Sequence, residues 1–413
     1  MLILFSFLMA NTVLISCLLG MTIAFYALLR RVENCKIPDR DLPFISVVIP
    51  ARNEEAKIGR CLESMLAQNY PNFEIVVIDD RSTDKTAEII ESYAKKDNRI
   101  KFVRGKDAPD GWVGKCNALA FAVGFASGDW YIFTDADTCH QPNSLRDAIG
   151  YAITNKVDLV SFVPLQELGS FFERMVMTVL LSSFVLGDAF HTVNDPLAKR
   201  AYAYGQYIIC RRRPYLALGG HQSVRDTIVE DHALGRVFKE KGYKIAVADG
   251  KNLYRVRMYM DLDSMWQGWT KNLYSLIDSS PVHLLCILSS LNMTVVMPFI
   301  NVLIVASLWI SHPADHFTPF STMLVACQFL MLIVWFRLTA EHRTGVNPLY
   351  FLTMPFGAAC VTMLHLHSAY LVLFGKEVSW KGRRYTVNTS KTIRSHRAGQ
   401  ETLENALSSD SGE

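Results

Sequence analysis

Trp130-Tyr-Ile-Phe-Thr-Asp-Ala-Asp137 is the stretch that decides the fold. Its β-branched and aromatic start predicts a buried strand, and the run ends in two carboxylates separated by one residue. In open α/β sheets ligands bind beyond the carboxyl ends of the strands, and carboxylate oxygens are hard ligands that suit Mg²⁺ or Mn²⁺. Asp135 and Asp137 are therefore candidate metal ligands at a substrate phosphate. A solvated turn is the alternative for so short a motif.

Predicted strands and helices alternate on both sides of this stretch. Short β-branched runs bounded by turn residues predict strands, and apolar residues at helical spacing predict the helices between them. The predicted strands are residues 45–49, 74–78, 99–104, 130–137, 158–163 and 204–210. Because strands alternate with helices, the order predicts an α/β fold with a mainly parallel sheet and right-handed crossovers.

Charged residues occupy the starts of two predicted helices. The positive charge of Lys115 opposes the helix dipole, so an anionic partner would explain it. A solvated surface lysine is the alternative. Glu230 and Asp231 also begin a helix, where acids are ordinary dipole partners. Their alternative role is that of a catalytic base facing the same cleft as Asp137.

Long uncharged runs give the chain its hydrophobic character. The 413 residues are 50% hydrophobic with a mean hydropathy of +0.16, above the usual soluble composition. The uncharged runs are residues 2–29, 279–313, 318–336 and 347–375. Each exceeds the roughly 18 apolar residues of a spanning helix, so we expect one N-terminal and about three C-terminal transmembrane helices. The first run is too long for a signal peptide and lacks its basic start, which favours an uncleaved anchor.

Basic residues follow the first and the last of these runs. They lie at 30–31 and at 376–384, so the positive-inside rule places both flanks in the cytoplasm. Three complete crossings after a cytoplasmic catalytic region would instead leave the tail outside. The run at 347–375 is expected to be re-entrant, because Pro355 and Gly357 interrupt it.

Two further segments are apolar without forming clean spans. Residues 171–190 are mostly apolar but include Glu173 and Asp188. A helix in the bilayer interface and a buried core helix fit this pattern equally. Residues 262–277, which include Trp269, show helical spacing directly before the second membrane run and predict an interfacial helix.

Charge and cysteine content exclude other classes of protein. The net charge of +3 is small and no basic block carries interleaved aromatics, so no nucleic-acid partner is expected. The 9 cysteines form no Cys-x-x-Cys pair, which predicts neither a zinc site nor a disulfide framework. The tail beyond Asn388 is polar, basic at first and acidic at its end, and is expected to be disordered.

Together the motifs resemble the membrane-bound members of glycosyltransferase family 2, whose catalytic domain has the Rossmann-like GT-A fold. The matching segments are 48–55, 78–86, 114–115, 135–137, 219–220, 230–231, 267–271 and 380–385. They cover most of residues 44–278 in the expected order. The one-plus-three membrane pattern and the segments Gly-Trp-Thr-Lys271 and Trp380-Lys-Gly-Arg are most similar to bacterial carotenoid-type (diaponeurosporenoate) and hopanoid-associated glycosyltransferases.

The resemblance implies an arrangement of the chain. A transmembrane anchor would occupy 1–31, and a GT-A glycosyltransferase domain with interfacial helices would occupy 41–280. C-terminal membrane helices would follow at 281–375, then a basic and finally disordered cytoplasmic tail at 376–413. The protein would be integral to the cell (inner) membrane and multi-pass, with its catalytic domain in the cytoplasm.

The resemblance also implies roles for individual residues. The nucleobase and ribose would be lined by Pro50, Ala51, Arg52, Glu54 and Asp80. Asp135 would meet the ribose or diphosphate, Asp137 would hold the Mg²⁺ or Mn²⁺, and Lys115 would neutralise the diphosphate. Asp231, next to Glu230, matches the general base of the family. The acceptor and the membrane interface would be faced by Gly220, His221, Gln267, Trp269 and Lys271.

The implied reaction is an inverting transfer from a nucleoside-diphosphate sugar, with a UDP-sugar the expected donor, to an isoprenoid or carotenoid-like lipid acceptor. One departure bears on product length. The Gln-x-x-Arg-Trp motif of processive members falls on 267–271, where Thr270 stands in the place of Arg and Lys271 in the place of Trp. This favours a single transfer over the alternative of a processive polysaccharide synthase. A non-catalytic membrane scaffold or transporter is the other alternative, although the four uncharged runs lack acids or lysines that would mark a transport path.

Overall fold

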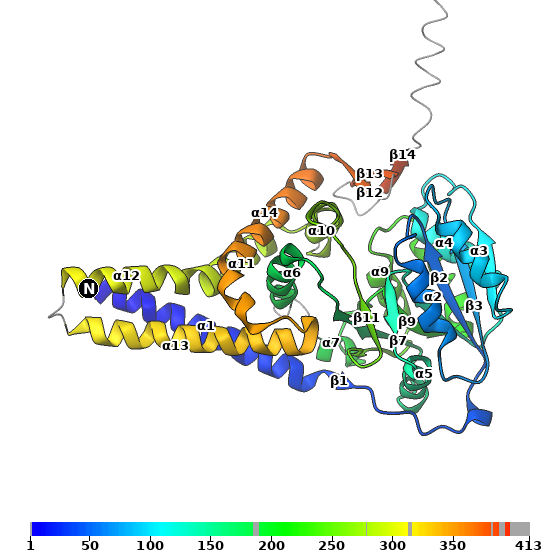
Figure 1. The fold of residues 1–413 in the computed structure, drawn as a ribbon, viewed down its shortest axis with the longest axis horizontal. Coiled ribbons are helices and arrows are strands. Elements are labelled where there is room, and N and C mark those ends of the chain that lie inside the picture. The colour runs from blue at the N-terminus through cyan, green and yellow to red at the C-terminus, as the bar shows by residue number, and fades with distance from the viewer. Residues whose placement is uncertain are drawn as a thin grey trace, which may run out of the picture.

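The chain builds an α/β body from which a bundle of long helices projects (Figure 1). The computed structural model describes residues 2–184, 190–277, 279–312, 316–380, 383–387 and 393–396. The body contains the predicted strand of residues 130–137, and the bundle contains the uncharged runs.

An eight-stranded sheet of order β1-β10-β7-β9-β5-β2-β3-β4 forms the centre of the body. Its strands are β1 (Arg30–Arg31), β2 (Ile45–Ala51), β3 (Phe73–Asp79), β4 (Ile100–Arg104), β5 (Trp130–Thr134), β7 (Leu159–Val163), β9 (Tyr207–Arg211) and β10 (Ile245–Asp249). β9 pairs antiparallel with β5 and β7, and the other pairs are parallel. The predicted α/β class with a mainly parallel sheet is confirmed. β5 ends at Thr134, so both carboxylates of the Asp-x-Asp lie just beyond the strand.

Helices cover both faces of this sheet. They are α2 (Ile58–Leu66), α3 (Thr86–Ala94), α4 (Gly114–Val123), α5 (Ser144–Thr154), α8 (Arg212–Ala217) and α9 (Glu230–Glu240). Alternate residues of β2 point to opposite faces: Ile45, Val47 and Ile49 join the core with α2 and α5, whereas Val48 joins the core with α4 and α9. Burying each aliphatic side chain stabilises the fold by roughly 1.5–3 kcal/mol.

A small sheet of order β6-β11-β8 begins with β6, directly after the Asp-x-Asp in the chain. Its strands are β6 (Thr138–His140), β8 (Leu165–Gln166) and β11 (Tyr254–Val256). β8 leads into α6 (Phe171–Phe184), and β11 leads toward α10 (Leu262–Leu276). The small sheet therefore connects the Asp-x-Asp with the two helices that lie nearest the bundle.

The helix α6 is mostly buried. It begins with a capping box, in which Ser170 Oγ accepts from the Glu173 backbone N at 3.2 Å and Glu173 Oε1 accepts from the Ser170 backbone N at 2.9 Å. Buried residues run from Met175 through Ser183, while Phe171 and Phe172 at its start are exposed. The two alternatives for this segment were an interfacial helix and a buried core helix. In the structure most of the helix is buried, and its first two residues are exposed and apolar. Asp188 lies outside the described residues.

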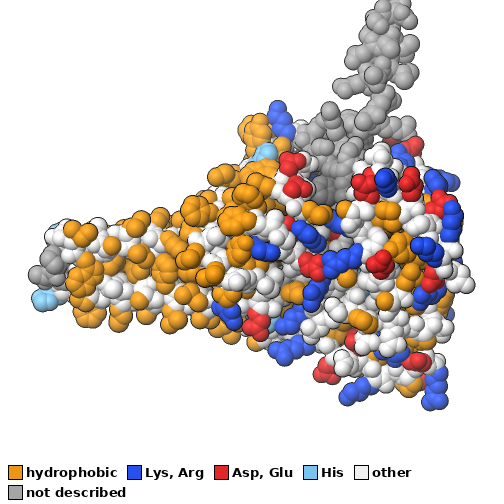
Figure 2. Space-filling model, in the orientation of Figure 1, with side chains coloured by type: hydrophobic (Ala, Val, Ile, Leu, Met, Phe, Trp, Pro, Cys, Tyr) orange, Lys and Arg blue, Asp and Glu red, His pale blue; other side chains and the backbone are white. Residues whose placement is uncertain are grey.

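Helical stretches long and apolar enough to cross a membrane are Leu2–Leu28, Pro281–Ser311, Phe317–Thr344 and Pro348–Leu373. They contain α1 (Leu2–Leu28), α11 (Pro281–Leu291), α12 (Met297–Ser311), α13 (Phe317–Thr339) and α14 (Met354–Leu373). We call α1, α12 and α13 the stalk. Hydrophobic side chains cover its visible face, whereas charged side chains gather over the body (Figure 2).

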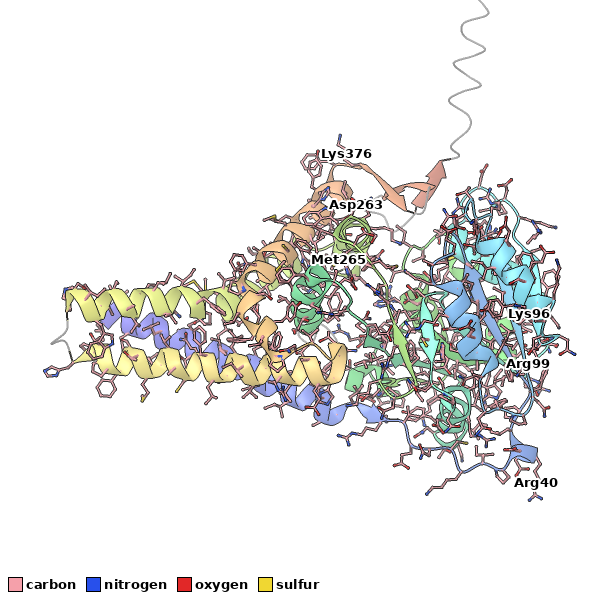
Figure 3. The ribbon with its side chains drawn as sticks, viewed as in Figure 1. Arg40, Lys96, Arg99, Asp263, Met265 and Lys376 are labelled. Carbon is pink, nitrogen blue, oxygen red and sulfur yellow. The ribbon has the colours of Figure 1, made fainter. Side chains whose placement is uncertain are left out.

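The helix α14 runs across the base of the stalk instead of along it (Figure 1). α12 leads away from the body and α13 returns to it, so α14 begins at the body end of the stalk. It also ends there, because Lys376 lies just past α14 near Asp263 of α10 (Figure 3), and Ser368 Oγ accepts from the Tyr274 backbone N at 2.9 Å.

Close contacts tie α14 to α6 and α10. A Cβ on Gly357 would lie 2.5 Å from the Met175 carbonyl oxygen and 2.9 Å from Val179 Cγ2, so glycine permits the close approach of α14 to α6. On α10, Trp266 Nε1 donates to His367 Nδ1 at 2.8 Å. Although it is apolar enough to span, α14 is packed against helices of the body.

Neutral amides form a buried cluster inside the stalk. Asn301 Nδ2 donates to Asn11 Oδ1 at 3.1 Å and to Gln328 Oε1 at 2.9 Å. Gln328 Nε2 donates in turn to Thr12 Oγ1 at 3.0 Å. The three amides are at most 4% exposed. They join α1, α12 and α13 without placing an ionised group among apolar side chains, where it would be costly.

Three short strands follow α14: β12 (Glu377–Trp380), β13 (Arg383–Val387) and β14 (Ile393–His396). β13 pairs antiparallel with both of its neighbours. Within the tail that is expected to be disordered beyond Asn388, residues 393–396 form β14, whose backbone pairs with β13. Residues 388–392 and 397–413 of the predicted tail lie outside the described residues.

Candidate active site

The direction in which the sheet grows reverses between β2 and β5. β3 and β4 lie on one side of β2, and β5 lies on the other. Open α/β sheets bind ligands beyond the strand ends at such a switch point. A hollow lies there, lined by Pro50, Lys115, Leu119, Phe133, Thr134, Asp135, Gly205, Ile208, His221, Glu230 and Asp231.

Lys115 joins two carboxylates at the centre of this hollow. Its Nζ lies 2.8 Å from Asp135 Oδ1 and 2.8 Å from Glu230 Oε1. Burial alone would lower the pKa of Lys115, but the two carboxylates outweigh it and raise this pKa well above its usual value. The lysine at the start of α4 thus has anionic partners, which come from the residue after β5 and from the start of α9.

Asp231 lies next to this ion cluster at the start of α9. Its Oδ2 accepts from the Gly205 backbone N at 2.6 Å, and its Oδ1 accepts from the His232 backbone N at 2.8 Å. A Cβ on residue 205 would stand 2.8 Å from Asp231 Oδ2, so glycine allows this approach. Burial raises the pKa of Asp231 above the ordinary 3.8, which makes its carboxylate a better proton acceptor.

Asp137 meets a second lysine, which the sequence analysis did not identify. Lys57 Nζ lies 4.0 Å from Asp137 Oδ2 and 3.8 Å from Glu54 Oε2, and it donates to the Met258 carbonyl at 2.9 Å. The two carboxylates of the Asp-x-Asp therefore face different lysines, Asp135 facing Lys115 from α4 and Asp137 facing Lys57 from the start of α2. The sequence did contain a signal for Lys57, because it lies three residues after Glu54 in a loop that was expected at the sheet edge.

A buried network holds the backbone of the Asp-x-Asp. Thr138 Oγ1 donates to the Asp135 carbonyl at 2.8 Å and lies 3.1 Å from His140 Nε2. The same ring nitrogen lies 3.0 Å from Thr134 Oγ1. Burial lowers the pKa of His140 to about 3, so the ring stays neutral and holds the side chains of Thr134 and Thr138 by hydrogen bonds. Sequence reasoning missed His140, which has no motif around it.

The expected nucleotide-binding residues lie at the ends of β2 and β3. The Asp80 backbone N donates to the Ala51 carbonyl at 2.7 Å, and Arg52 Nη1 donates to the Asp80 carbonyl at 2.6 Å. The Glu54 backbone N donates to Thr86 Oγ1 at 2.7 Å. Both loops are thus fastened together at the edge that carries Pro50, which itself lines the hollow.

The expected acceptor residues do not gather at one place. His221 is buried in the wall of the hollow, where its Nδ1 lies 2.7 Å from the Tyr215 hydroxyl, and Gly220 leaves room for the Tyr215 ring. Burial and then Lys115 lower the pKa of His221 to about 3. The other three lie on α10, where Trp269 Nε1 donates to Met177 Sδ at 3.1 Å, Gln267 Nε2 donates to Asp263 Oδ2 at 2.7 Å, and Lys271 follows.

The donor set suits a divalent cation that is shared with a phosphate. Among the described residues, no three His, Cys, Asp or Glu side chains gather closely enough to hold a metal ion by themselves. Mg²⁺ is usually held by one or two carboxylates together with substrate phosphates. Asp137 and Asp135 supply such carboxylates at the sheet edge, so the residues fit a cation whose coordination a ligand completes.

Comparison with known proteins finds matches to the body of the chain. Residues 46–215 match the family model described as glycosyl transferase family 2. The chain is 31% identical over 233 residues to 4,4'-diaponeurosporenoate glycosyltransferase of Staphylococcus aureus (strain USA300), covering 55% of this chain and 60% of the relative. It thus spans about 60% of the length of the curated relatives it matches.

Two solved structures are also similar. A mannosyltransferase from Pyrobaculum calidifontis, in complex with GDP-Man and Mn²⁺, has 19% identity and a TM-score of 0.48, covering 86% of this chain and 99% of that chain. Glucosyl-3-phosphoglycerate synthase from Mycobacterium tuberculosis has 20% identity and a TM-score of 0.40, covering 60% and 86%. Residues 46–215, which contain most strands of the mainly parallel sheet, are therefore similar to glycosyl transferase family 2.

Proposed function

We propose that the protein is an inverting glycosyltransferase that moves a sugar from a nucleoside-diphosphate sugar to an isoprenoid or carotenoid-like lipid at the cytoplasmic face of the membrane. The observation that carries this proposal is the hollow at the switch point of a family 2 domain. Lys115, Asp135 and Glu230 line this hollow together with Asp231, whose pKa is raised by burial. The S. aureus relative is named 4,4'-diaponeurosporenoate glycosyltransferase, and this name supports a lipid acceptor.

Each side chain of the hollow has a task in this reaction. Asp231 takes the proton from the acceptor oxygen as that oxygen attacks the anomeric carbon, which inverts the carbon in one displacement. Lys115 supplies positive charge to the departing diphosphate, and Glu230 holds the Lys115 ammonium in place. Pro50, Ala51 and Asp80 form the wall on the nucleoside side.

A Mg²⁺ or Mn²⁺ ion belongs to the proposal. Asp137, with Asp135 beside it, would hold the ion through carboxylate oxygens. When bound, the ion stabilises negative charge on the leaving nucleoside diphosphate. Lys57, 4.0 Å from Asp137, keeps that carboxylate neutralised and oriented before the ion arrives.

The membrane arrangement that we propose has three crossings. α1 and α13 would cross toward the body, and α12 would cross away from it. α14 would lie at the cytoplasmic interface, since both of its ends are at the body end of the stalk. This arrangement puts the basic residues after α1 and after α14 on the same side, as the positive-inside rule requires. The protein would be a multi-pass protein of the cell (inner) membrane.

Incubation of membranes with labelled sugar nucleotides, followed by lipid extraction, tests the function. Label should enter the lipid phase from one sugar nucleotide, with UDP-sugars tested first. Membranes with the Asp110→Ala protein, changed at an exposed loop residue, serve as the matched control and should transfer equally. If the label enters only a long water-soluble polymer, the protein is a processive synthase and the proposal is wrong. No transfer from any sugar nucleotide to added lipid would contradict it.

A further inference from the structure

A buried histidine, His221, lies in the wall of the hollow at the switch point. It is 2% exposed, and it lines the hollow together with Lys115 and Asp231. Its ring packs edge to face against Phe133, with the ring centroids 4.8 Å apart. Nδ1 is engaged by the Tyr215 hydroxyl, whereas Nε2 forms no hydrogen bond with any residue that the structure describes. Nε2 is therefore the ring nitrogen that remains for a ligand of the hollow.

The Tyr215 hydroxyl fixes which ring nitrogen carries the hydrogen. Its oxygen accepts from the His221 backbone N at 3.1 Å and lies 2.7 Å from Nδ1. If Nδ1 carried the hydrogen, the buried Tyr215 hydroxyl would find no acceptor for its own proton in the described part of the chain, and leaving a buried donor unsatisfied is costly. The Tyr215 O–H therefore donates to Nδ1. The hydrogen of the neutral ring then lies on Nε2, which makes this nitrogen a donor.

The ring of His221 offers this N–H without a charge. Burial, and then the positive charge of Lys115, lower the pKa of His221 to about 3, so the ring is neutral at physiological pH. Gly219 and Gly220 precede it with positive φ angles of 78° and 50°, and a Cβ on Gly220 would collide with the Tyr215 ring. The two glycines thus allow Tyr215 to approach His221.

The other polar groups of the hollow limit what Nε2–H can bind. Asp135, Glu230 and Asp231 are acceptors, and the Lys115 ammonium is shared by the first two. The entering group has to offer a lone pair to Nε2–H and to tolerate the nearby carboxylates. A hydroxyl does both, because it accepts and donates without carrying charge. The hollow has room for about one water-sized group, which a single hydroxyl of a larger ligand fits.

The proposed reaction brings two kinds of oxygen to this site, those of the transferred sugar and that of the acceptor. A hydrogen bond donated to the acceptor oxygen would lower its nucleophilicity as it attacks, whereas the same bond to a sugar hydroxyl leaves the reacting oxygen free. His221 also lies near enough to Lys115 for that charge to lower its pKa, and Lys115 is the proposed partner of the diphosphate that carries the sugar. These arguments favour a hydroxyl of the sugar.

We propose that His221 Nε2–H donates to one hydroxyl oxygen of the transferred sugar, and that Tyr215 is the positioning residue that keeps the hydrogen on Nε2. The inference rests on the proposed function and makes it more specific. The family resemblance implied a place for His221 at the acceptor, and the proposal places it at the sugar instead. The sugar O–H can donate to Glu230, which leaves Asp231 free for the acceptor proton. A site of this kind selects its sugar, because it rejects an analogue that lacks the hydroxyl.

Donor binding to the full-length protein in lipid nanodiscs, with Mn²⁺ present, tests the proposal. The donor is whichever of UDP-glucose, UDP-galactose and GDP-mannose the wild type binds most tightly. His221→Leu should weaken its binding about tenfold, the value of one hydrogen bond, and leave binding of the bare nucleoside diphosphate unchanged. Among donor analogues that each lack one hydroxyl, one should bind the wild type about tenfold more weakly than the donor does, and it should bind His221→Leu equally well. His221→Gln, whose amide N–H can take the place of Nε2–H, should recover most of the affinity.

His365→Leu and Tyr70→Phe are the matched controls. His365 is likewise 2% exposed but lies on α14, away from the hollow. Tyr70 is buried and donates to the Pro43 carbonyl at 2.7 Å. Both control variants should keep the donor affinity of the wild type. Tyr215→Phe loses a buried hydroxyl as Tyr70→Phe does, but it should also weaken donor binding about threefold, because the ring hydrogen can then move to Nδ1.

Each other outcome overturns a stated part of the proposal. Wild-type donor affinity in His221→Leu would mean that the hollow holds only water, and it would overturn the sugar contact. Equal weakening of donor and bare nucleotide would place Nε2 at the nucleotide instead. Unchanged donor affinity in Tyr215→Phe would overturn the positioning role of Tyr215. A wild type that binds none of the three nucleotide sugars would contradict the proposed function as well, whereas normal donor binding and transfer by His221→Leu would contradict this inference alone.

Discussion

The sheet edge and the stalk both bury polar groups, but they do so with different chemistry. At the sheet edge Lys115, Asp135 and Glu230 are charged groups in mutual contact. In the stalk Asn301 and Gln328 are neutral amides that bond to one another and to α1. The charged groups serve the proposed chemistry, whereas the amides join helices where charge would be too costly, although Asn301 Oδ1 has no hydrogen-bond partner among the described residues. The variants below test this distinction.

The largest effect is expected from Asp137→Ala. This change removes the carboxylate proposed to hold the divalent cation, which supplies several kcal/mol of charge stabilisation, so sugar transfer should fall by about 10³-fold or more. Transfer to lipid in membranes that contain equal amounts of protein is the measurement, with Asp110→Ala as the control. Turnover near the wild-type value would remove Asp137 from the metal site.

Asp231→Asn should lower kcat by about 10²–10⁴-fold, the usual contribution of a general base, with donor affinity little changed. The wild type should show a related pH dependence. A base works when ionised, so kcat/KM is lost as the pH falls through its pKa. Because burial raises the pKa of Asp231, this loss should begin at a higher pH than for an aspartate of pKa 3.8. An acid limb that persists unchanged in the Asn variant would exclude the assignment.

Asn301→Leu should have a much smaller effect on catalysis. It removes two hydrogen bonds of the stalk cluster, and such bonds within membranes stabilise by about 0.6 kcal/mol on average. Thermal unfolding in detergent should therefore show a loss of about 1 kcal/mol, while turnover per folded molecule stays within about twofold. A loss of turnover as large as that of Asp231→Asn would place the stalk amides in the catalytic machinery.

Single cysteine reporters should leave turnover unchanged and show the sides of the membrane. Cysteines replacing Arg40 and Lys376 should react with an impermeant maleimide only after cells are opened. A cysteine replacing His312, at the outer end of α12, should react in intact cells. The unmodified protein is the labelling control, since Cys17, Cys286 and Cys327 are its exposed thiols and lie on the apolar helices. Labelling of residue 376 in intact cells would mean that α14 crosses.

Local patterns predicted the strands and the helix starts because each depends on a few neighbouring residues. The β-branched run before Asp135 and the positive charge of Lys115, which opposes the dipole of its helix, were sufficient to locate the edge of the sheet where the site lies. The partners of Lys115 could not be predicted, because Glu230 comes from a distant segment that only the sheet topology brings close. The charge rule and Pro355 gave the expectation that residues 347–375 do not cross completely. The packing of α14 against α6 and α10 could not be predicted, since a spanning helix and a helix packed on the body have the same apolar composition.

The shared ammonium of Lys115 has a consequence for how a donor enters. One positive charge lies against the two carboxylates of Asp135 and Glu230, so these three side chains together carry a net negative charge before Asp231 is counted. A free diphosphate would be repelled by such a cleft. The nucleotide sugar should therefore arrive as its magnesium or manganese chelate, and the concentration of that chelate, not of total nucleotide, should govern the saturation curve.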